Sequence, residues 1–485
     1  MGPDRDRTFY GLQSEFRRKS LMVFAVLLLF YIVSIGLLVL MVDAGIGLIF
    51  AKPRMFALSH LAGLLIVAVV FALGLGAFHY YDAKINGAAY ILKRLSARPP
   101  EFRDRYHKEM EDVVDAVRLA SGVPRVRAVV IPDPAVNSLV VVELDGTACV
   151  AMTEGLLAAF TRDEIAAAAA HELAHVARGD AVLMTFICAL TDFYERLWES
   201  LQPSRPRESD DIMPLSEVLF RLLGRFLSRE REILADAAAV EIGRDPAALA
   251  RAIFKAHLAS GFVGEFRSAY APLFIVSPDA REDDGERPAG WAGSHPPVMT
   301  RIKLLAELAH IAPEDIIRQV WDERARRESA KEIVSLHEDV PVEIAVPRVL
   351  KPEARGACPR CGLPLVENCY EGVYLGQCRR CAGRLVDESA LPRLLARTEV
   401  GFSEALRRKA HDFKDRFLRN PVNTLKINEA FLPQAVCPSC GGKMRTRPFS
   451  YQYFVPVDRC FSCAKTWFDA DELEILQVLV EEARK

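Results

Sequence analysis

His171-Glu172-Leu173-Ala174-His175 places two imidazoles and a carboxylate within little more than one helical turn. Two histidines at i and i+4 lie on the same face of a helix, so both can offer a ring nitrogen to one metal ion. Glu172 would lie beside that metal, where a carboxylate can take a proton from an activated water and pass it to a leaving amine. The stretch therefore predicts a zinc site with hydrolytic chemistry.

The residues around this motif predict that it lies on a well-defined helix. Thr161-Arg162-Asp163-Glu164 has the pattern of a capping box, with Thr161 as the N-cap and Glu164 three positions later. The alanine run 166–170 continues with strong helix formers, and Gly179 with Asp180 ends the element.

The sequence after Ser228 supplies a candidate third ligand. Glu232 and Asp236 are again i and i+4 on a predicted helix. Glu232 can complete a His-His-Glu set with the fourth position open to water, while Asp236 can accept the free ring N–H of a ligating histidine. The alternative is that both carboxylates belong to a solvated acidic face.

At these residues the sequence resembles the HtpX-like membrane zinc metallopeptidases, relatives of the CAAX prenyl endopeptidases, over about residues 100–310. The resemblance implies a mainly α, zincin-type α+β domain that hydrolyses peptide bonds of proteins, in the turnover of membrane or misfolded proteins. It also implies His171, His175 and Glu232 as zinc ligands, Glu172 as the general base and Asp236 as the residue that orients a ligand.

Three further stretches match the same family. Thr153–Leu157 precedes the metal helix, as it does in the family. The stretch 137–142 resembles the edge strand beside the cleft, which implies that substrate adds to this strand at Asn137, Ser138, Leu139 and Val140. His295-Pro296-Pro297 with Arg301 resembles a downstream element, which implies that His295 stabilises the oxyanion and that Arg301 helps to bind substrate. For His295, an ordinary loop histidine is the alternative.

The sequence departs from the resemblance in one region. HtpX itself carries additional membrane spans between its metal helix and its third ligand. Here Ala181–Leu190 is too short to cross a bilayer, and the charged residues Asp192, Glu195 and Arg196 follow soon after it. We expect a buried or interfacial helix in this region.

Two apolar segments near the N-terminus carry the membrane signal. Leu21–Val42 and Phe56–Phe78 are each long enough to span a hydrocarbon core of roughly 30 Å, and neither contains a charged residue. The short connection between them predicts a transmembrane helical hairpin within residues 1–80. A signal peptide is the alternative for the first segment, but its apolar core is too long and the second segment follows at once.

Basic residues flank the hairpin at its two outer ends and are scarce in the connection, where only Lys52 and Arg54 occur. This asymmetry predicts that both termini and the active site face the cytoplasm. The expected location is the inner (plasma) membrane, as a multi-pass protein in contact with lipid.

Eight of the 11 cysteines form an internal repeat of CxxC pairs. The first unit contains Cys358, Cys361, Cys378 and Cys381, and the second contains Cys437, Cys440, Cys460 and Cys463. Four thiolates at this spacing predict a closed, tetrahedral, structural zinc site in each unit, so we expect one catalytic and two structural Zn²⁺ ions. Paired disulfides are the alternative, which a reducing cytoplasm disfavours. Both units resemble small bacterial zinc ribbons likened to the ribbon of transcription factor IIB, which implies small β domains.

The predicted order of domains is a hairpin (1–80), a metallopeptidase domain (81–312), a helix with a linker (313–357), a first ribbon (358–392), a helical connector (393–436) and a second ribbon (437–475). A net charge of -2 gives no global basic field, so nucleic acid is not an expected partner. We expect protein or peptide substrates and a protein partner for the ribbons.

A membrane-tethered adaptor is the alternative function, with ribbons that bind protein or nucleic acid and an inactive protease scaffold. The intact ligands and base argue against it. Prenyl-protein processing has no support in this chain beyond the shared superfamily.

Overall fold

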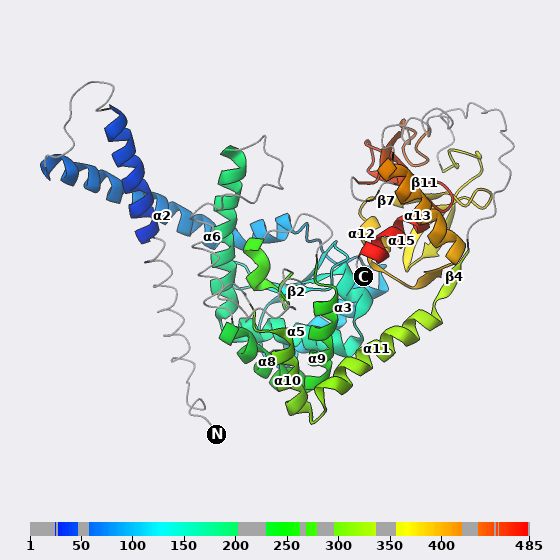
Figure 1. The fold of residues 1–485 in the computed structure, drawn as a ribbon, viewed down its shortest axis with the longest axis horizontal. Helices are drawn as coiled ribbons and strands as arrows, with labels where there is room; N and C mark the ends of the chain where they lie inside the picture. Colours follow the sequence, from blue (N-terminus) through cyan, green and yellow to red (C-terminus); the bar gives the residue numbers. More distant parts are fainter. Residues whose placement is uncertain are drawn as a thin grey trace.

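The computed structural model describes residues 25, 28–46, 58–201, 229–261, 268–278, 295–335, 356–419, 435–450, 453 and 455–483. Figure 1 shows an N-terminal helical arm, a central body of helices around a small sheet, and a C-terminal module. The expected linker at 340–352 lies outside the described residues.

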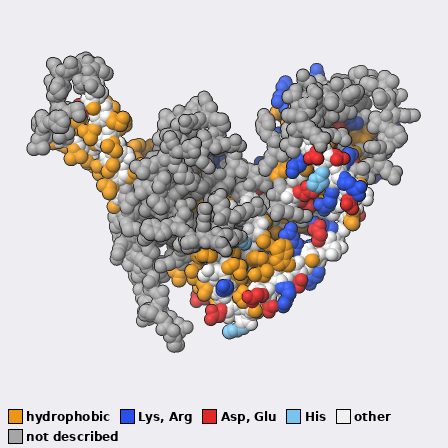
Figure 2. Space-filling model, viewed as in Figure 1, with side chains coloured by type: hydrophobic (Ala, Val, Ile, Leu, Met, Phe, Trp, Pro, Cys, Tyr) orange, Lys and Arg blue, Asp and Glu red, His pale blue; other side chains and the backbone are white. Residues whose placement is uncertain are grey.

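The arm consists of the helix Leu28–Ile46 and of α2 (Leu58–Arg94), and both are long and apolar enough to cross a membrane. Figure 2 shows hydrophobic side chains at the surface of the arm. Leu37, Ile66 and Phe71 are each more than half exposed. Such exposure suits contact with lipid. The second helix continues well beyond the expected end at Phe78, because its polar C-terminal part packs on α6 (Asp180–Leu201).

Helix α6 is longer than the expected stretch Ala181–Leu190 and follows α5 (Arg162–Ala177) after a sharp bend of 88°. It forms a further candidate span only if the two helices are counted together. The buried carboxylate of Asp192 on α6 lies 3.6 Å from the guanidinium of Arg94 on α2, so an ion pair ties the arm to the central body.

The central body contains a three-stranded sheet of β1 (Val126–Ile131), β2 (Ser138–Val142) and β3 (Ala148–Thr153), in the order β1-β3-β2. β1 pairs with β3 in parallel and β2 pairs with it antiparallel, so β2 lies at the edge of the sheet. The surrounding helices are α3 (Arg105–Ser121), α4 (Glu154–Ala159), α8 (Arg229–Gly243), α9 (Pro246–Leu258), α10 (Val298–Ala309) and α11 (Pro313–Ala330).

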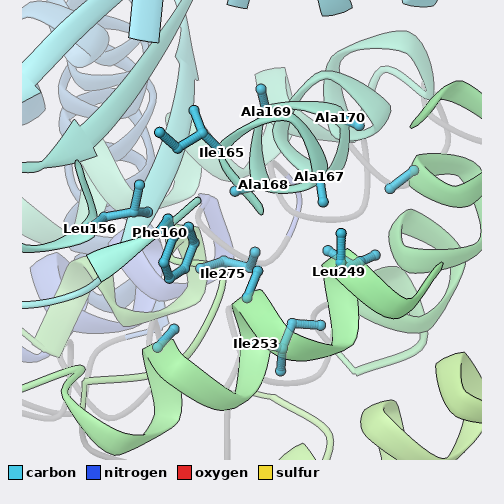
Figure 3. Close-up of a cluster of buried hydrophobic side chains, with 14 of the residues drawn as sticks. Leu156, Phe160, Ile165, Ala167, Ala168, Ala169, Ala170, Leu249, Ile253 and Ile275 are labelled. Carbon is cyan, nitrogen blue, oxygen red and sulfur yellow. The ribbon is translucent and has the colours of Figure 1, made fainter. Parts of the chain in front are cut away.

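Helix α5 lies at the centre of this body and begins as the sequence predicts. The N–H of Glu164 donates to the Thr161 hydroxyl at 3.4 Å, and the N–H of Thr161 donates to the Glu164 carboxylate at 2.8 Å. Its alanines face Leu249 and Ile253 of α9 (Figure 3). Because alanine side chains are small, neighbouring elements pack close to α5 and bury the motif that it carries.

The C-terminal module differs from the two separate ribbons that were expected. β5 (Val366–Tyr370), β6 (Val373–Gln377), β7 (Arg384–Asp387), β9 (Arg445–Pro448), β10 (Pro456–Cys460) and β11 (Lys465–Phe468) form one six-stranded sheet. The two cysteine units meet where β7 pairs with β11. Arg360 of the first unit also donates to Asp458 and Asp469 of the second, at 2.6 and 2.8 Å.

Each connector contains a short strand in addition to the expected helix. After α11 the chain forms β4 (Glu332–Val334), which pairs in parallel with β8 (Val400–Phe402) and joins the C-terminal module. The expected helical connector contains β8 and α13 (Glu404–Arg419), preceded by α12 (Leu391–Ala396). These helices and α15 (Glu472–Ala483) pack with the sheet around a hydrophobic core of their own.

Candidate active site

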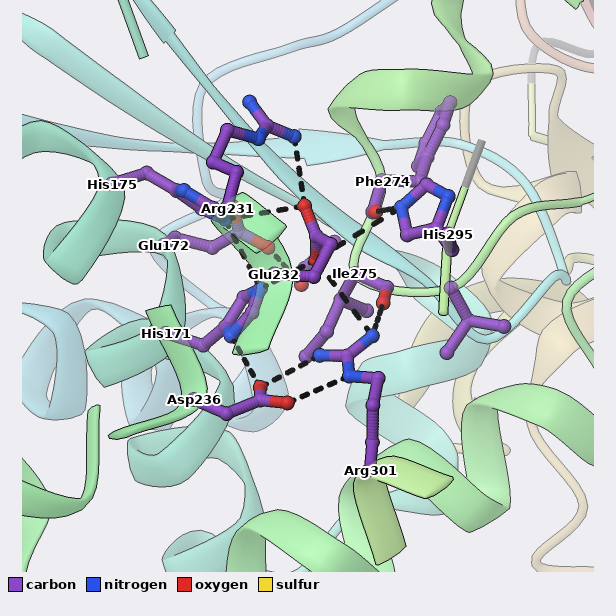
Figure 4. Close-up of polar contacts among 12 residues, drawn as sticks. His171, Glu172, His175, Arg231, Glu232, Asp236, Phe274, Ile275, His295 and Arg301 are labelled. Carbon is purple, nitrogen blue, oxygen red and sulfur yellow. Dashed lines mark hydrogen bonds and ion pairs between the residues drawn. The ribbon is translucent and has the colours of Figure 1, made fainter. Parts of the chain in front are cut away.

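Helix α5 carries His171 and His175, helix α8 carries Glu232, and the three side chains converge (Figure 4). The two Nε2 atoms are 3.3 Å apart, and they lie 3.4 and 3.6 Å from the nearest Glu232 oxygens. Donors about 2.1 Å from a tetrahedral zinc ion would lie about 3.4 Å from one another. The three residues are 1%, 3% and 0% exposed, and their arrangement fits one zinc ion.

A carboxylate fixes the other ring nitrogen of each histidine. Nδ1 of His171 is 3.0 Å from Asp236, and Nδ1 of His175 is 3.1 Å from Asp180. A carboxylate at Nδ1 holds that nitrogen protonated and leaves Nε2 free to bind metal. The sequence predicts Asp236 for this role, whereas it marks Asp180 only as part of the end of the metal helix. Gly179, with a φ of +79°, makes the turn that brings Asp180 back to His175.

Glu172 is fully buried next to the two histidines and accepts a hydrogen bond of 2.6 Å from the hydroxyl of Ser138. Burial raises the pKa of Glu172 above its ordinary value, which brings it nearer the range that suits a general base. Ser138 lies on β2, so the edge strand fixes the direction of the candidate base.

Two buried arginines neutralise the carboxylates around the metal position. Arg231 donates to Glu232 at 2.8 Å, and Arg301 donates to both oxygens of Asp236 at 2.7 Å. Burial would raise the pKa of Glu232, but Arg231 and the neighbouring histidines hold it well below its usual value. Glu232 is therefore ionised, as a metal ligand must be. Sequence reasoning missed Arg231, because no local pattern separates it from the neighbouring Arg229 in the first turn of α8.

The chain's own residues 272–276 cover the outer edge of β2. Phe274 pairs antiparallel with Leu139, and the N–H of Ile275 donates to the Ser138 carbonyl at 3.0 Å. The side-chain amide of Asn137 donates to the Val276 carbonyl at 2.8 Å. The edge expected to be open for substrate is thus occupied in this structure.

The same segment accepts hydrogen bonds from three further side chains of the site. His295 Nε2 donates to the Phe274 carbonyl at 2.7 Å, Arg301 donates to the Ile275 carbonyl at 2.5 Å, and Arg231 donates to the Pro272 carbonyl at 2.6 Å. Burial lowers the pKa of His295 to about 4, so its ring is a neutral donor. Of the expected substrate residues, Leu139 and Val140 are buried on β2 and Arg301 faces Asp236.

Each cysteine unit brings its four sulfur atoms within 4.8 Å of one another. The Sγ atoms of Cys358 and Cys381 are 3.5 Å apart, and those of Cys440 and Cys460 are 3.4 Å apart. Four thiolates about 2.3 Å from a tetrahedral zinc would be separated by about 3.8 Å. Both units therefore fit a zinc ion with no position left for substrate.

Comparison with known proteins agrees with these sites. Residues 103–318 match peptidase family M48, and residues 436–477 match the transcription factor zinc-finger family. A protease HtpX homolog of Listeria monocytogenes is 28% identical over 305 residues, which are 58% of this chain and 95% of the relative.

Two other protease HtpX homologs give similar values. That of Thermoanaerobacter pseudethanolicus is 27% identical over 322 residues, 62% of this chain and 98% of the relative, and that of Gemmatimonas aurantiaca is 25% identical over 255 residues, 50% of this chain and 89% of the relative. No solved structure matches the chain. The chain is therefore a membrane-associated zinc metallopeptidase whose residues 103–318 are similar to peptidase family M48 and to the HtpX proteases, and whose residues 436–477 are similar to a transcription factor zinc finger.

Proposed function

We propose that this protein is a membrane-anchored zinc endopeptidase that cleaves unfolded or membrane proteins on the cytoplasmic side of the inner membrane. The convergence of His171, His175 and Glu232 at tetrahedral spacing beside Glu172 carries the proposal. The basic residues outside the two apolar helices support the orientation. The two cysteine units fit structural metal ions, so the chemistry is assigned to the central body.

Each residue of the site has a defined role in the proposed reaction. His171, His175 and Glu232 would hold the zinc ion, which would supply Lewis acidity to a scissile carbonyl and to water when bound. Glu172, aimed by Ser138, takes the proton from the attacking water and delivers it to the leaving amine as the C–N bond breaks. His295, which holds a backbone carbonyl in this structure, would donate to the oxyanion of the tetrahedral intermediate.

We further propose that a substrate pairs with β2 at Asn137–Val140, in the place that residues 272–276 take in this structure. The hydrogen bonds from Asn137 and to Ser138 involve only the main chain of the covering segment, so a substrate could form them with any sequence. This mode favours broad specificity for extended chains. Arg301 would hold Asp236 and Glu232 in place instead of contacting the substrate.

Sealed membrane vesicles of opposite orientation test the proposal. Inverted vesicles expose the cytoplasmic face, so we expect them to degrade added casein and to stop when a zinc chelator is present. Right-side-out vesicles should leave casein intact until detergent opens them. Cleavage by intact right-side-out vesicles would contradict the cytoplasmic site, and chelator-resistant cleavage would contradict the zinc mechanism.

A further inference from the structure

We propose that Arg397 of the C-terminal module is a positioning residue for the substrate strand, so that the zinc ribbons set the substrate affinity of the peptidase domain. The inference rests on the proposed use of β2 by substrate. It assigns the ribbons an intramolecular role that their fold alone does not reveal.

A buried ion pair joins the two parts of the chain. Arg397 donates to the carboxylate of Asp104 at 2.5 Å, and each residue is only 2% exposed. Arg393 approaches the same oxygen at 3.3 Å. Burial would raise the pKa of Asp104, but Arg397 and its neighbours lower it, so the carboxylate stays charged. Breaking one side of a buried pair leaves an uncompensated charge, which makes this contact a strong constraint on geometry.

Arg397 lies between the first turns of two helices of the peptidase domain. Asp104 caps α3 by accepting the N–H of Tyr106 at 3.0 Å. On the other side, the guanidinium of Arg397 is 4.0 Å from Glu154, the first residue of α4, which is buried and bonded to His107 of α3 at 3.1 Å. The C-terminal module therefore fixes where α4 begins.

The beginning of α4 in turn supports Asn137. Thr153, the N-cap of α4, accepts the N–H of Asn137 at 3.0 Å and donates its own N–H to the Asn137 carbonyl at 3.1 Å. The N–H of Gly155 donates to the Asp133 carbonyl at 3.1 Å. A Cβ atom at Gly155 would lie only 1.9 Å from the Pro134 carbonyl oxygen, so the loop 133–137 rests directly on α4.

The zinc ligands belong to other helices. Within the part of the chain that the structure describes, Arg397 contacts Asp104, Glu154, the Glu371 carbonyl and the ring of Tyr106, whereas the metal ligands lie on α5 and α8. A change at Arg397 should thus move the loop 133–137 and with it Asn137, while Ser138 stays paired with Met152 of β3 and the zinc stays bound. The expected signature is a change in KM with kcat and metal content preserved.

Steady-state kinetics of the full-length, detergent-purified protein test this inference, with a fluorogenic peptide from casein as the substrate and zinc measured in every sample. We expect Arg397→Met to raise KM by roughly 3- to 30-fold with little change in kcat. Asp104→Asn, which keeps a capping residue but removes the charge, should have the same effect. Arg397→Lys should restore part of the affinity. The matched control is Arg318→Met on α11, whose side chain is 70% exposed and should not affect KM.

Asn137→Ala separates this inference from the proposed function. If it leaves KM unchanged, the proposed use of β2 fails and the inference fails with it. If it raises KM while Arg397→Met and Asp104→Asn do not, only the inference is overturned. A fall in kcat with loss of the catalytic zinc would also overturn it, because Arg397 would then act only on general stability. Should Arg397→Met not fold, Asp104→Asn decides.

Discussion

His171 and His175 each have a carboxylate at Nδ1, and the two carboxylates reach them by different routes. Asp236 lies one turn beyond Glu232 on α8, whereas Asp180 follows the turn at Gly179. Both fix the ring orientation that exposes Nε2 to the metal. The precision of the site therefore depends on residues that do not bind the metal themselves.

Removing the charge at Asp180 should weaken only the catalytic zinc site. We expect Asp180→Asn to lower zinc affinity there by roughly 10- to 100-fold, because the His175 ring loses its charged partner. Zinc retention during dialysis against a graded chelator series measures this effect. Asp163→Asn, at an exposed position in the first turn of α5, is the control. Equal zinc retention in both variants would show that Asp180 does not support zinc binding by His175.

Local spacing explains which site residues could be predicted from the sequence. His171, His175 and Glu172 share one helix, and Glu232 and Asp236 share another, so periodicity alone groups them. The roles of Asp180, Arg231 and Arg301 depend on a turn and on contacts across elements, as in the 2.8 Å bond from Arg231 to Glu232. Residues 272–276 carry no motif, so their cover over β2 could not be foreseen.

At the scale of elements, the short helix α4 contacts both the loop before β2 and the C-terminal module. Thr153 is its N-cap, and its first turn packs against the loop 133–137. Helix α12 of the C-terminal module also contacts α4. Gly155 is required there because the loop backbone fills the space of a Cβ atom. The helix thus links the ribbons to the strand that we propose for substrate.

Gly155→Ala should destabilise the protein and displace this loop. The added methyl group meets the Pro134 carbonyl, and we expect a loss of about 1–3 kcal/mol in the free energy of unfolding, together with a higher KM. Gly74→Ala, with nothing within 4 Å of the new methyl, is the matched control. Thermal unfolding and peptide kinetics of both variants provide the comparison. Equal stability of the two would mean that the loop does not rest on α4.

Elements that depend on local signals could be predicted from the sequence, whereas pairings between distant strands could not. The capping box at Thr161 and Glu164 is a local signal and correctly marks the start of α5. The pairing of β7 with β11, and of β4 with β8, joins segments distant in sequence. Such pairings depend on tertiary packing, so the sequence predicted two ribbon domains and a helical connector but not the strands that join them.

At the scale of the whole molecule, one six-stranded sheet joins the two cysteine units into a single folded unit. Their cores also meet, because Trp467 of the second unit packs with cysteines of both units. A ribbon of this size has little core apart from its metal, so loss of one zinc should disrupt the sheet that the other unit needs.

Substituting one pair of cysteines tests this cooperation. We expect Cys437→Ser with Cys440→Ser to lower the zinc content from three ions per chain to one, because both structural ions are lost together. Cys369→Ser, at an exposed cysteine outside both sets, is the control. Retention of two ions in the double variant would show that the units fold independently.

We propose above that Glu172 would activate water at a zinc ion held by His171, His175 and Glu232. Casein cleavage by detergent-purified wild type and Glu172→Gln, with zinc quantified in each, tests it most directly. We predict equal zinc content and a loss of activity of roughly 100-fold or more in the variant. Equal cleavage by both proteins, or inactivity of both with zinc only in the cysteine units, would contradict the account.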